Sequence, residues 1–347
     1  MRKAYPMAMV KTPGKVEFED RPVPALSAGQ VLIKTRAVSI CGSDVHTFKG
    51  KHPFAPLPAA LGHELAGEIA GVAKEVDRLQ IGDRVVLEPV ITCGHCEFCL
   101  KGVYNLCSNV SYYHRQGQGA FTPYFVADQQ RVFKLPDNVT FEEGALVEPL
   151  AVAVHAVQKA GIKIGAHVAV FGVGAVGLMI LVLSRLQGAA GVFAVDVHDF
   201  RLAKARDLGA AGAFSNADGK AVAQIIERTG GCGVEVSFEA VGIQATFVQA
   251  LEVLKKGGHA VVVGLNAEPQ VTLPANIFVQ KEISLSGTQG YCHDFQTALA
   301  LLENGAVDLS PLITHTLLCD EIQEGFDLLT TPGNEAVKVV IVYNQDD

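Results

Sequence analysis

The stretch that decides the fold of the second half of the chain is VAVFGVGAVGLMILVLSRLQGAAGVFAVD, residues 168–196. It opens with an apolar run of strand length, continues through Gly172-x-Gly174-x-x-Gly177 into an apolar helical segment, and ends in a second apolar run that closes on Asp196. This order of strand, glycine-rich turn, helix, strand and acid predicts a βαβ unit that binds a dinucleotide.

Each glycine of this turn is expected to have its own physical task. Gly172 makes the tight turn, Gly174 lets the backbone approach the pyrophosphate, and Gly177 lets helix and strand pack closely. Val176 lies in the same loop and is counted with the cofactor-binding residues. The N-terminus of the following helix offers unpaired N–H groups and the positive end of the helix dipole to the phosphates.

Asp196 indicates which dinucleotide binds. A carboxylate at the end of the second strand accepts hydrogen bonds from the 2′- and 3′-hydroxyls of the adenosine ribose and repels a 2′-phosphate, which predicts NAD rather than NADP. Arg201 is expected to line the adenine cleft, with a solvated helix residue as the alternative. The alternative for the whole motif is a glycine-rich turn that binds no nucleotide.

The segments around this unit continue the alternation of strands and helices. Continuous apolar strands alternating with helices predict an α/β fold with a doubly wound parallel sheet. The expected strands are 167–171, 191–195, 234–238, 260–263 and 283–286, and the expected helices are 141–161, 175–187 and 200–208. Two more helices are expected at 295–303 and 321–329. A last strand at 336–343 is expected to return to the sheet of the N-terminal part.

The N-terminal part has a different character. Residues 30–38 (QVLIKTRAV) and 83–89 (DRVVLEP) read as strands separated by Pro- and Gly-rich turns. We therefore expect a mostly β domain. The predicted division is 1–150 with 286–347 for one domain, which includes a cysteine lobe at about 90–110, and 151–285 for the dinucleotide-binding domain.

Composition and charge exclude several classes of protein. The 347 residues are 49% apolar and 18% charged, with a net charge of −8, which is typical of folded domains rather than of disorder. The absence of a Lys/Arg-rich run argues against a nucleic-acid partner. No apolar run reads as a signal peptide or a membrane span, so a cytoplasmic protein that does not enter a membrane is expected.

Four of the eight cysteines are clustered as Cys93-Gly-His-Cys96-Glu-Phe-Cys99, with Cys107 after seven further residues. Such short gaps let one loop present several thiolates to a single ion, and four thiolates form a closed, structural zinc site. A redox CxxC pair leaves two thiols unexplained, whereas an iron–sulfur cluster stays open as an alternative. His95 lies inside the loop, but four cysteines already fill the coordination shell.

A second set of metal-binding residue types is spread along the first 150 residues. It comprises Cys41, the pair His63-Glu64, and Glu148 before Pro149. Cysteine, histidine and carboxylate form a catalytic zinc site when one position stays open to water or substrate. Each of these residues is ordinary alone, because a buried cysteine usually packs as a small hydrophobe and a Glu-Pro step usually marks a helix boundary. The interpretation depends on their joint occurrence.

These stretches together resemble the zinc-dependent medium-chain dehydrogenase/reductase superfamily, in particular its sorbitol (polyol) dehydrogenase branch. The stretches that carry the resemblance are collinear over most of the chain: ICGSDVH, LGHELAGEI, IGDRV, CGHCEFCLKGVYNLC, GALVEPLAVAVHA and VFGVGAVGLMI. The resemblance implies a GroES-like, mostly β catalytic domain, a Rossmann coenzyme domain, one catalytic and one structural zinc, and NAD. It also implies a homodimer or homotetramer.

The resemblance also implies a role for individual residues. Cys41 and His63 would bind the catalytic zinc, Glu64 would be a ligand or alternate ligand, and Glu148 would lie at the zinc directly or through its water. Ser43 would touch the reacting hydroxyl, and His46 would pass the proton outward. Three further residues fall where the family lines its nicotinamide pocket: Val263, Gly264 and Thr288.

One departure from the family pattern bears on the substrate. Tyr291 matches a substrate-binding tyrosine of animal sorbitol dehydrogenases, but Gly290 stands where those enzymes have an arginine. Sorbitol itself is therefore weakly supported. A polyol or sugar-derived alcohol is expected, an L-threonine or vicinal-diol (butanediol-type) dehydrogenase stays open, and a non-catalytic NAD-binding structural protein is the alternative of another class.

Overall fold

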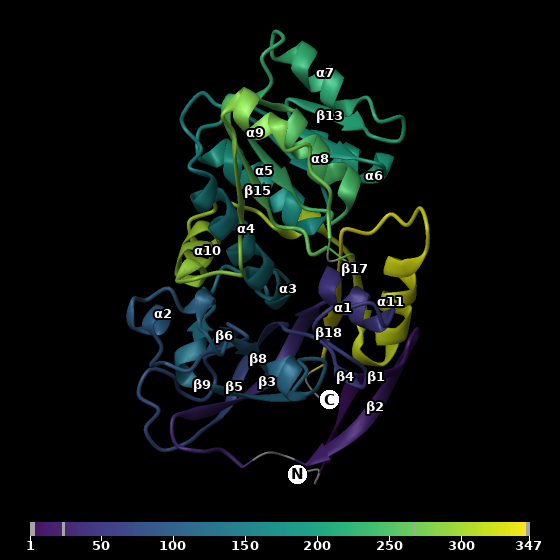
Figure 1. Cartoon of the computed structure of the whole chain (residues 1–347). Helices are drawn as coiled ribbons and strands as arrows, with labels where there is room; N and C mark the ends of the chain where they lie inside the picture. Colours follow the sequence, from purple (N-terminus) through teal and green to yellow (C-terminus); the bar gives the residue numbers. More distant parts are fainter. Residues whose placement is uncertain (1–3, 23–24, 267, 269, 345–347) are drawn as a thin grey trace. The chain divides into compact units, whose positions relative to one another are not determined.

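The structure is a computed structural model that describes residues 4–22, 25–266, 268 and 270–344 (Figure 1). The chain divides into two compact units. Unit 1 comprises residues 1–149 and 295–347, and unit 2 comprises residues 150–294. No helix in the described part of the chain is both long and apolar enough to cross a membrane.

Unit 1 is built on β-sheets. Its larger sheet has the order β10-β6-β5-β3-β18-β17, with β9 also paired to β3. The strands of this sheet are β3 (Gln30–Ser39), β5 (Glu64–Val72), β6 (Arg84–Leu87), β9 (Tyr124–Asp128), β10 (Val132–Lys134), β17 (Ile313–Leu318) and β18 (Lys338–Val342). A second sheet has the order β2-β1-β4, formed by β1 (Ala4–Thr12), β2 (Lys15–Pro22) and β4 (Ala59–Ala60), and β7 (Val90–Ile91) pairs with β8 (Ser111–Tyr112).

The strand β18 confirms the prediction that the C-terminal strand returns to the sheet of the N-terminal part. It pairs antiparallel with β3, so that Val340 lies opposite Ser39. Alternating buried residues of β3, β5 and β18 form the main hydrophobic core of unit 1, together with Phe121 and Phe326. This core holds the β3 and β18 ends beside the start of β5, where the site described below lies.

The helices of unit 1 are short. They are α1 (Gly42–Phe48), α2 (Glu97–Leu100), α3 (Phe141–Ala145) and α11 (Ile322–Thr330), with 3₁₀ turns η1 (Tyr104–Leu106), η2 (Tyr113–Gln116), η3 (Gln129–Arg131), η4 (Ser310–Leu312) and η5 (Cys319–Glu321). Two helices cross the division between the units: α4 (Val147–Ala160) and α10 (Asp294–Glu303).

Unit 2 confirms the predicted doubly wound α/β fold. Its six parallel strands have the order β13-β12-β11-β14-β15-β16, which is the strand order of a Rossmann fold. They are β11 (His167–Phe171), β12 (Gly191–Asp196), β13 (Gly212–Ser215), β14 (Val234–Glu239), β15 (Leu254–Val262) and β16 (Ser284–Gly287). The connecting helices are α5 (Ala175–Leu186), α6 (Asp199–Asp207), α7 (Ala221–Arg228), α8 (Gln244–Glu252) and α9 (Asn276–Lys281).

The structure differs from the sequence prediction in one helix and in one domain boundary, besides the elements that were not predicted. The single helix expected over 141–161 is two helices, α3 and α4, which separate at Leu146. Residues 286–294, which were assigned to the catalytic domain, belong to unit 2. The reason for the second difference is that β16 runs to Gly287 and pairs in parallel with β15, which attaches this segment to the Rossmann sheet.

Candidate functional site

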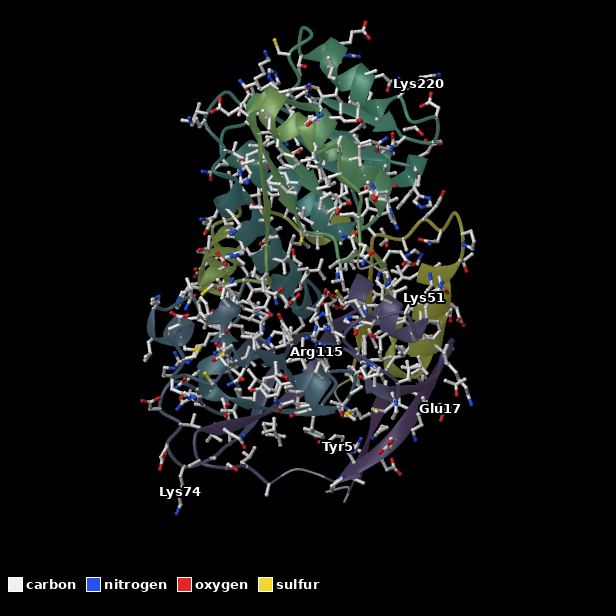
Figure 2. All side chains as sticks on the ribbon, viewed as in Figure 1. Tyr5, Glu17, Lys51, Lys74, Arg115 and Lys220 are labelled. Carbon is white, nitrogen blue, oxygen red and sulfur yellow. The ribbon has the colours of Figure 1, made fainter. Side chains whose placement is uncertain are left out.

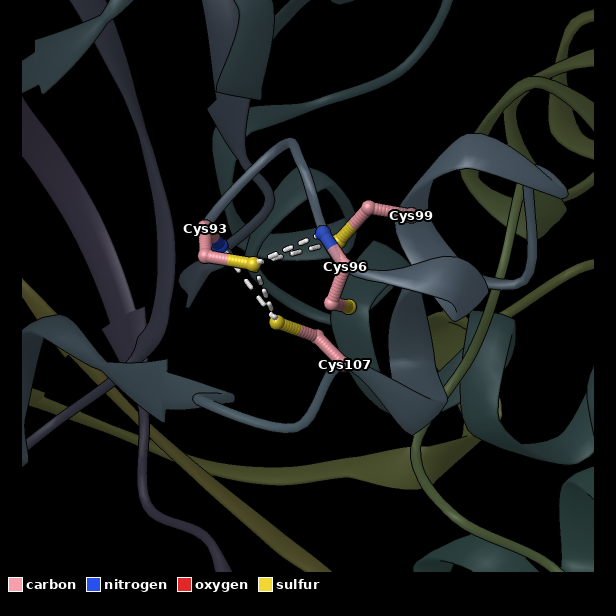
Figure 3. Close-up of side chains that lie close together, drawn as sticks. All are labelled: Cys93, Cys96, Cys99 and Cys107. Carbon is pink, nitrogen blue, oxygen red and sulfur yellow. Dashed lines mark hydrogen bonds between the residues drawn. The ribbon is translucent and has the colours of Figure 1, made fainter.

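The four clustered cysteines converge on one point (Figure 3). Their sulfur atoms all lie within 4.8 Å of one another. Cys93 Sγ lies 3.5 Å from Cys107 Sγ and 4.0 Å from Cys99 Sγ. These separations are too long for a disulfide and bracket the roughly 3.8 Å between sulfurs that tetrahedral Zn–S bonds of about 2.3 Å imply. The cluster therefore has the chemistry and spacing that a four-thiolate metal site requires.

Backbone amides favour the thiolate form of Cys96 and Cys107, whereas burial raises the pKa of Cys99 to about 11. The N–H groups of Cys93 and Asn109 donate to Cys107 Sγ at 3.3 and 3.4 Å. Backbone hydrogen bonds from Cys99 and Ser108 lower the pKa of Cys96 to about 5. A thiolate is the metal-binding form of cysteine, so Cys96 and Cys107 are the members of the cluster that the backbone favours in that form.

A buried polar network joins this cysteine lobe to the sheet beneath it. Tyr104, in the turn η1 between Cys99 and Cys107, donates its hydroxyl to Glu88 Oε1 at 2.5 Å. Arg131 pairs with Glu88 Oε2 at 2.5 Å and lies over the Tyr104 ring. Glu88 is fully buried, so its charge depends on these two partners. The interactions of Glu88 with Tyr104 and Arg131 therefore hold the cysteine lobe against the rest of unit 1, in addition to any metal bound by the cysteines.

Three of the four residues of the second predicted metal-binding set also come together. One ligand atom each from Cys41, His63 and Glu64 lies within 4.8 Å of the others. Cys41 is the N-cap of α1, whereas His63 and Glu64 lie at the start of β5. Gly62 precedes them at φ +87°, where a Cβ would collide with the Phe121 ring, so only glycine fits this turn.

Asp44 joins the two segments that carry these ligands, a role that the sequence reading did not assign. Its carboxylate accepts the Gly62 N–H at 3.0 Å and the Cys41 N–H at 3.1 Å, and it lies 3.6 Å from His63 Nδ1. Burial raises the pKa of Asp44, but His63 and the Gly62 amide outweigh it and bring this pKa to about 2. Asp44 is therefore ionised and orients His63, as carboxylates beside metal-ligating histidines do.

Lys338, on β18, is the second residue of this site that the sequence reading missed. Its ammonium group, which is 3% exposed, forms an ion pair with Glu64 Oε2 and donates to the carbonyl oxygen of Ile40 at 3.3 Å. Ser39 Oγ donates to the same Glu64 oxygen. The signal was present, since a lysine inside the apolar run AVKVVIVY is buried only when it is paired.

The other carboxylate oxygen of Glu64, Oε1, has a different environment from Oε2. Glu64 Oε1 is buried and has no hydrogen-bond partner among the described residues. A carboxylate oxygen without a partner in the protein interior is costly unless something else binds it. Because this oxygen belongs to the group of Cys41, His63 and Glu64, the residues fit a bound cation.

The remaining predicted catalytic residues lie around this group. Ser43 and His46 lie on α1, the helix that Cys41 caps. Burial, then Lys49 and Lys51, lower the pKa of His46, so its imidazole is neutral at neutral pH. Glu148 is buried and is one of the negative charges that raise the pKa of Lys338, but it lies outside the three-residue group.

A layer of rings extends from His63 along unit 1. The His114 ring lies 4.9 Å from the His63 ring, and the Tyr112 ring lies 5.7 Å from that of His114. Burial and the neighbouring His63 lower the pKa of His114 to about 3, and burial and Arg115 lower that of His52 to about 4. Both imidazoles are neutral at neutral pH.

In unit 2 the glycine-rich turn has the predicted geometry. Gly172 ends β11 at φ +88°, and Gly174 is the N-cap of α5. A Cβ on Gly177 would lie 1.9 Å from the Gly172 carbonyl oxygen, which is the close packing of helix on strand that the motif predicts. Val176 lies half-buried in the first turn of α5.

A pocket of about 390 Å³ lies beside this turn, lined among others by Gly172, Gly174, Asp196 and Arg201. The Asp196 carboxylate accepts the backbone N–H groups of Val173, Val197 and His198 at 2.8–3.0 Å. Arg201 Nη1 lies 3.9 Å from Asp196 Oδ2. The structure thus brings both predicted adenosine-binding residues into one pocket with the glycines.

The predicted nicotinamide-pocket residues lie at the same edge of the sheet but outside that pocket. Val263 and Gly264 follow β15 and donate their N–H groups to the carbonyl oxygen of Glu239 at 2.8 and 2.9 Å. Thr288 follows β16 and donates its N–H to the carbonyl oxygen of Val262. Tyr291, the predicted substrate-binding residue, is buried in the segment between β16 and α10.

The chain matches two protein-family models. Residues 27–137 match the alcohol dehydrogenase GroES-like domain, and residues 175–304 match the zinc-binding dehydrogenase domain. The sorbitol dehydrogenase of Bacillus subtilis is 34% identical over 97% of each chain. The L-idonate 5-dehydrogenase of Vitis vinifera is 37% identical over 92% of this chain and 89% of its own length.

A solved structure agrees with these sequence matches. The 2R,3R-butanediol dehydrogenase of Bacillus subtilis superposes with a TM-score of 0.89 at 33% identity, over 98% of this chain and all of its own. Fold, both cysteine-containing clusters and full-length similarity agree. The chain therefore belongs to the zinc-dependent medium-chain dehydrogenase/reductase superfamily, as an oxidoreductase of its sorbitol dehydrogenase-like branch.

Proposed function

We propose that this protein oxidises a secondary alcohol of a polyol or sugar-derived substrate, with one catalytic zinc, one structural zinc and NAD. The observation that carries the proposal is the buried group of Cys41, His63 and Glu64, in which one Glu64 oxygen has no hydrogen-bond partner in the described part of the chain. Thiol, imidazole and carboxylate are the donor set of a catalytic zinc site.

The two metal sites have different tasks in this proposal. Cys41, His63 and Glu64 would hold the catalytic ion, and Glu148 would lie at it directly or through a water molecule. The four lobe cysteines would hold the second ion in a closed shell, which leaves no position for a substrate. Unit 1 would then be the catalytic unit, and unit 2 the coenzyme-binding unit.

When bound, zinc supplies a Lewis acid that lowers the pKa of the substrate hydroxyl, and NAD accepts the hydride. The chain's own residues would handle the proton and the geometry. Ser43 would accept the hydrogen bond of the reacting hydroxyl, and His46, neutral at neutral pH, would receive the proton and release it. Asp44 and Lys338 would keep His63 and Glu64 in place.

The choice of NAD rests on Asp196. Its carboxylate lines the pocket beside the glycine turn, where ribose hydroxyls are donors and a 2′-phosphate would meet a negative charge. The carboxylate already accepts three backbone N–H groups, which fix its orientation. Arg201 in the same pocket is the one feature that would favour a phosphate, but it faces Asp196.

The substrate class is supported by the relatives. Two of them are a sorbitol dehydrogenase and an L-idonate 5-dehydrogenase, and a structural neighbour is a butanediol dehydrogenase. A polyol or sugar-derived alcohol is therefore the first candidate substrate, and L-threonine or a vicinal diol is the second. The complete Cys41, His63 and Glu64 group argues against a non-catalytic NAD-binding protein.

The test is a substrate panel with the purified, zinc-containing protein. Sorbitol, other polyols, butanediol, sugar acids and threonine are supplied with NAD or NADP, and the formation of reduced coenzyme is followed by absorbance. We expect oxidation of at least one polyol or sugar-derived substrate, with NAD preferred. Oxidation of none of them, or a strong preference for NADP, would contradict the proposal.

Two further expectations belong to this proposal. We expect a homodimer or homotetramer, as sedimentation equilibrium of the purified protein would measure. We also expect a cytoplasmic location, which fractionation of cells that express the protein would test.

A further inference from the structure

A cavity of about 210 Å³ lies in unit 1, and one residue of its wall, His114, also packs against His63 of the Cys41 group. One side is the loop after α1, and the other is the turn η2. Most of its wall is apolar: Met9, Phe54, Ala55, Pro56, Pro58, Ala59 and Ala60. The lining also includes Gly117 and two residues with polar side chains, His114 and Arg115.

His114 connects this cavity to the metal-binding group. Its ring lines the cavity and at the same time lies 4.9 Å from the ring of His63. His114 Nδ1 is buried and has no hydrogen-bond partner among the described residues. The His114 ring therefore contacts both the cavity and a member of the Cys41 group.

Arg115 provides the fixed positive charge of the cavity. Its guanidinium group lies 4.9 Å from the centre of the Tyr112 ring and 5.8 Å from that of Phe54, so it packs against two aromatic rings. Arg115 is labelled in Figure 2. No carboxylate in the described part of the chain forms an ion pair with it, whereas Arg36 and Arg131 pair with Glu68 and Glu88.

We propose that the substrate is an anionic alcohol and that Arg115 binds its carboxylate or phosphate group while the Cys41 group holds the reacting hydroxyl. The inference rests on the proposed dehydrogenase function and adds the substrate class. A guanidinium group matches the two oxygens of a carboxylate or phosphate with two parallel hydrogen bonds between opposite charges, whereas the hydroxyls of a neutral polyol can accept hydrogen bonds but carry no charge.

The size of the cavity limits the anion. A water molecule occupies about 30 Å³ in the liquid, so 210 Å³ accommodates about seven atoms of that size. A carboxylate or phosphate with the neighbouring carbon atoms fits this volume.

The test compares neutral and anionic substrates on matched variants. D-sorbitol, D-gluconate, L-idonate and sorbitol 6-phosphate are oxidised by wild type, Arg115→Gln and Arg115→Lys, with Arg228→Gln as the control for loss of an exposed arginine. Arg228 lies at the end of α7, in unit 2. Wild type should have a higher kcat/KM for an anionic substrate than for sorbitol. Comparison of the two sugar acids with the phosphate ester shows whether a carboxylate or a phosphate is bound.

We expect Arg115→Gln to raise KM for the preferred anionic substrate by about tenfold or more, since one charge-assisted interaction is lost. Its kcat should change less than threefold, and its KM for sorbitol less than twofold. Arg115→Lys should recover part of the loss, and Arg228→Gln should match wild type. Preference for sorbitol over all three anions, or an equal KM in Arg115→Gln and wild type, would overturn the inference.

A binding measurement separates this inference from the proposed function. Calorimetric titration of the zinc-containing protein with NADH and each of the three anions needs no turnover. Weaker binding of the anions by Arg115→Gln than by wild type supports the inference, even if no alcohol is oxidised. The absence of oxidation would contradict only the proposed function. Equal affinity of the two proteins for the anions, or no binding of any anion by wild type, would overturn the inference. The proposed function would still stand in that case if the protein oxidises sorbitol.

Discussion

At the scale of single residues, the ion pair of Lys338 and Glu64 decides how the Glu64 carboxylate is held. Both side chains are buried, and the ammonium group and Ser39 occupy only one of the two carboxylate oxygens. Breaking a buried pair by removing one partner leaves an uncompensated charge, which costs more than the pair contributes. The pair therefore makes Glu64 a stable anion with one oxygen available.

We predict that Lys338→Met lowers the free energy of unfolding by about 3–5 kcal/mol. The double variant Lys338→Met/Glu64→Gln should recover most of this loss, because it removes the unpaired charge. Lys101→Met is the control, since Lys101 pairs with Glu97 at the surface and should contribute less than about 1 kcal/mol. Urea denaturation measures all three, and a Lys338→Met variant as stable as wild type would refute the buried-charge argument.

Residue types and the family resemblance predicted the candidate metal-binding residues of this site better than the residues that support them. Cys41, His63 and Glu64 were identified because their residue types bind metals, and the structure brings them together. Asp44 and Lys338 were missed because their partners are set by the fold. Lys338 meets Glu64 only after β18 has paired with β3, and no local pattern encodes that pairing.

At the scale of elements, regular apolar patterns predicted the central strands and helices of unit 2 closely. The strand β11 has the predicted bounds, and α5 ends one residue earlier than predicted. Short, half-exposed strands such as β13 and β17 gave no such pattern and were missed. The break between α3 and α4 follows from Pro149, whose missing N–H and fixed φ suit the first turn of a helix but not an interior.

The two glycines of the β11–α5 turn should respond differently to a methyl group. Gly177→Ala should lower the free energy of unfolding by about 1–3 kcal/mol, because its Cβ would meet the Gly172 carbonyl oxygen at 1.9 Å. Gly174→Ala meets nothing within 4 Å and should change stability little, but it should weaken NADH binding by placing a methyl group where the pyrophosphate approaches.

Urea denaturation and titration with NADH fluorescence measure these two effects separately. Equal stability of the two variants would show that the close approach of α5 to β11 does not constrain position 177. Unchanged NADH affinity in Gly174→Ala would place the pyrophosphate elsewhere.

At the scale of the whole molecule, buried ionisable groups make stability depend on pH. Burial raises the pKa of Tyr113, in the core of unit 1, to about 12 from 10.0. The folded state therefore keeps this proton at a pH where the unfolded chain loses it. The stabilisation is complete below pH 10 and is lost as the pH rises toward 12.

The variant Tyr113→Phe isolates this contribution. Between about pH 9 and pH 11, the free energy of unfolding of wild type should fall by about 1 kcal/mol more than that of the variant. The variant also removes the acceptor of the Asp128 N–H, which changes its free energy of unfolding at every pH. The comparison therefore uses only how steeply the free energy of unfolding of each protein falls with pH. Parallel pH profiles of the two proteins would contradict the raised pKa.

The central claim is that two separate metal sites exist in unit 1 and that only the Cys41 group performs the chemistry. Zinc content by mass spectrometry, measured with NAD-linked alcohol oxidation on wild type and Cys41→Ser, tests it most directly. We predict two zinc ions per chain for wild type, and about one zinc ion with no detectable oxidation for Cys41→Ser. Full activity and two zinc ions in Cys41→Ser would contradict the account.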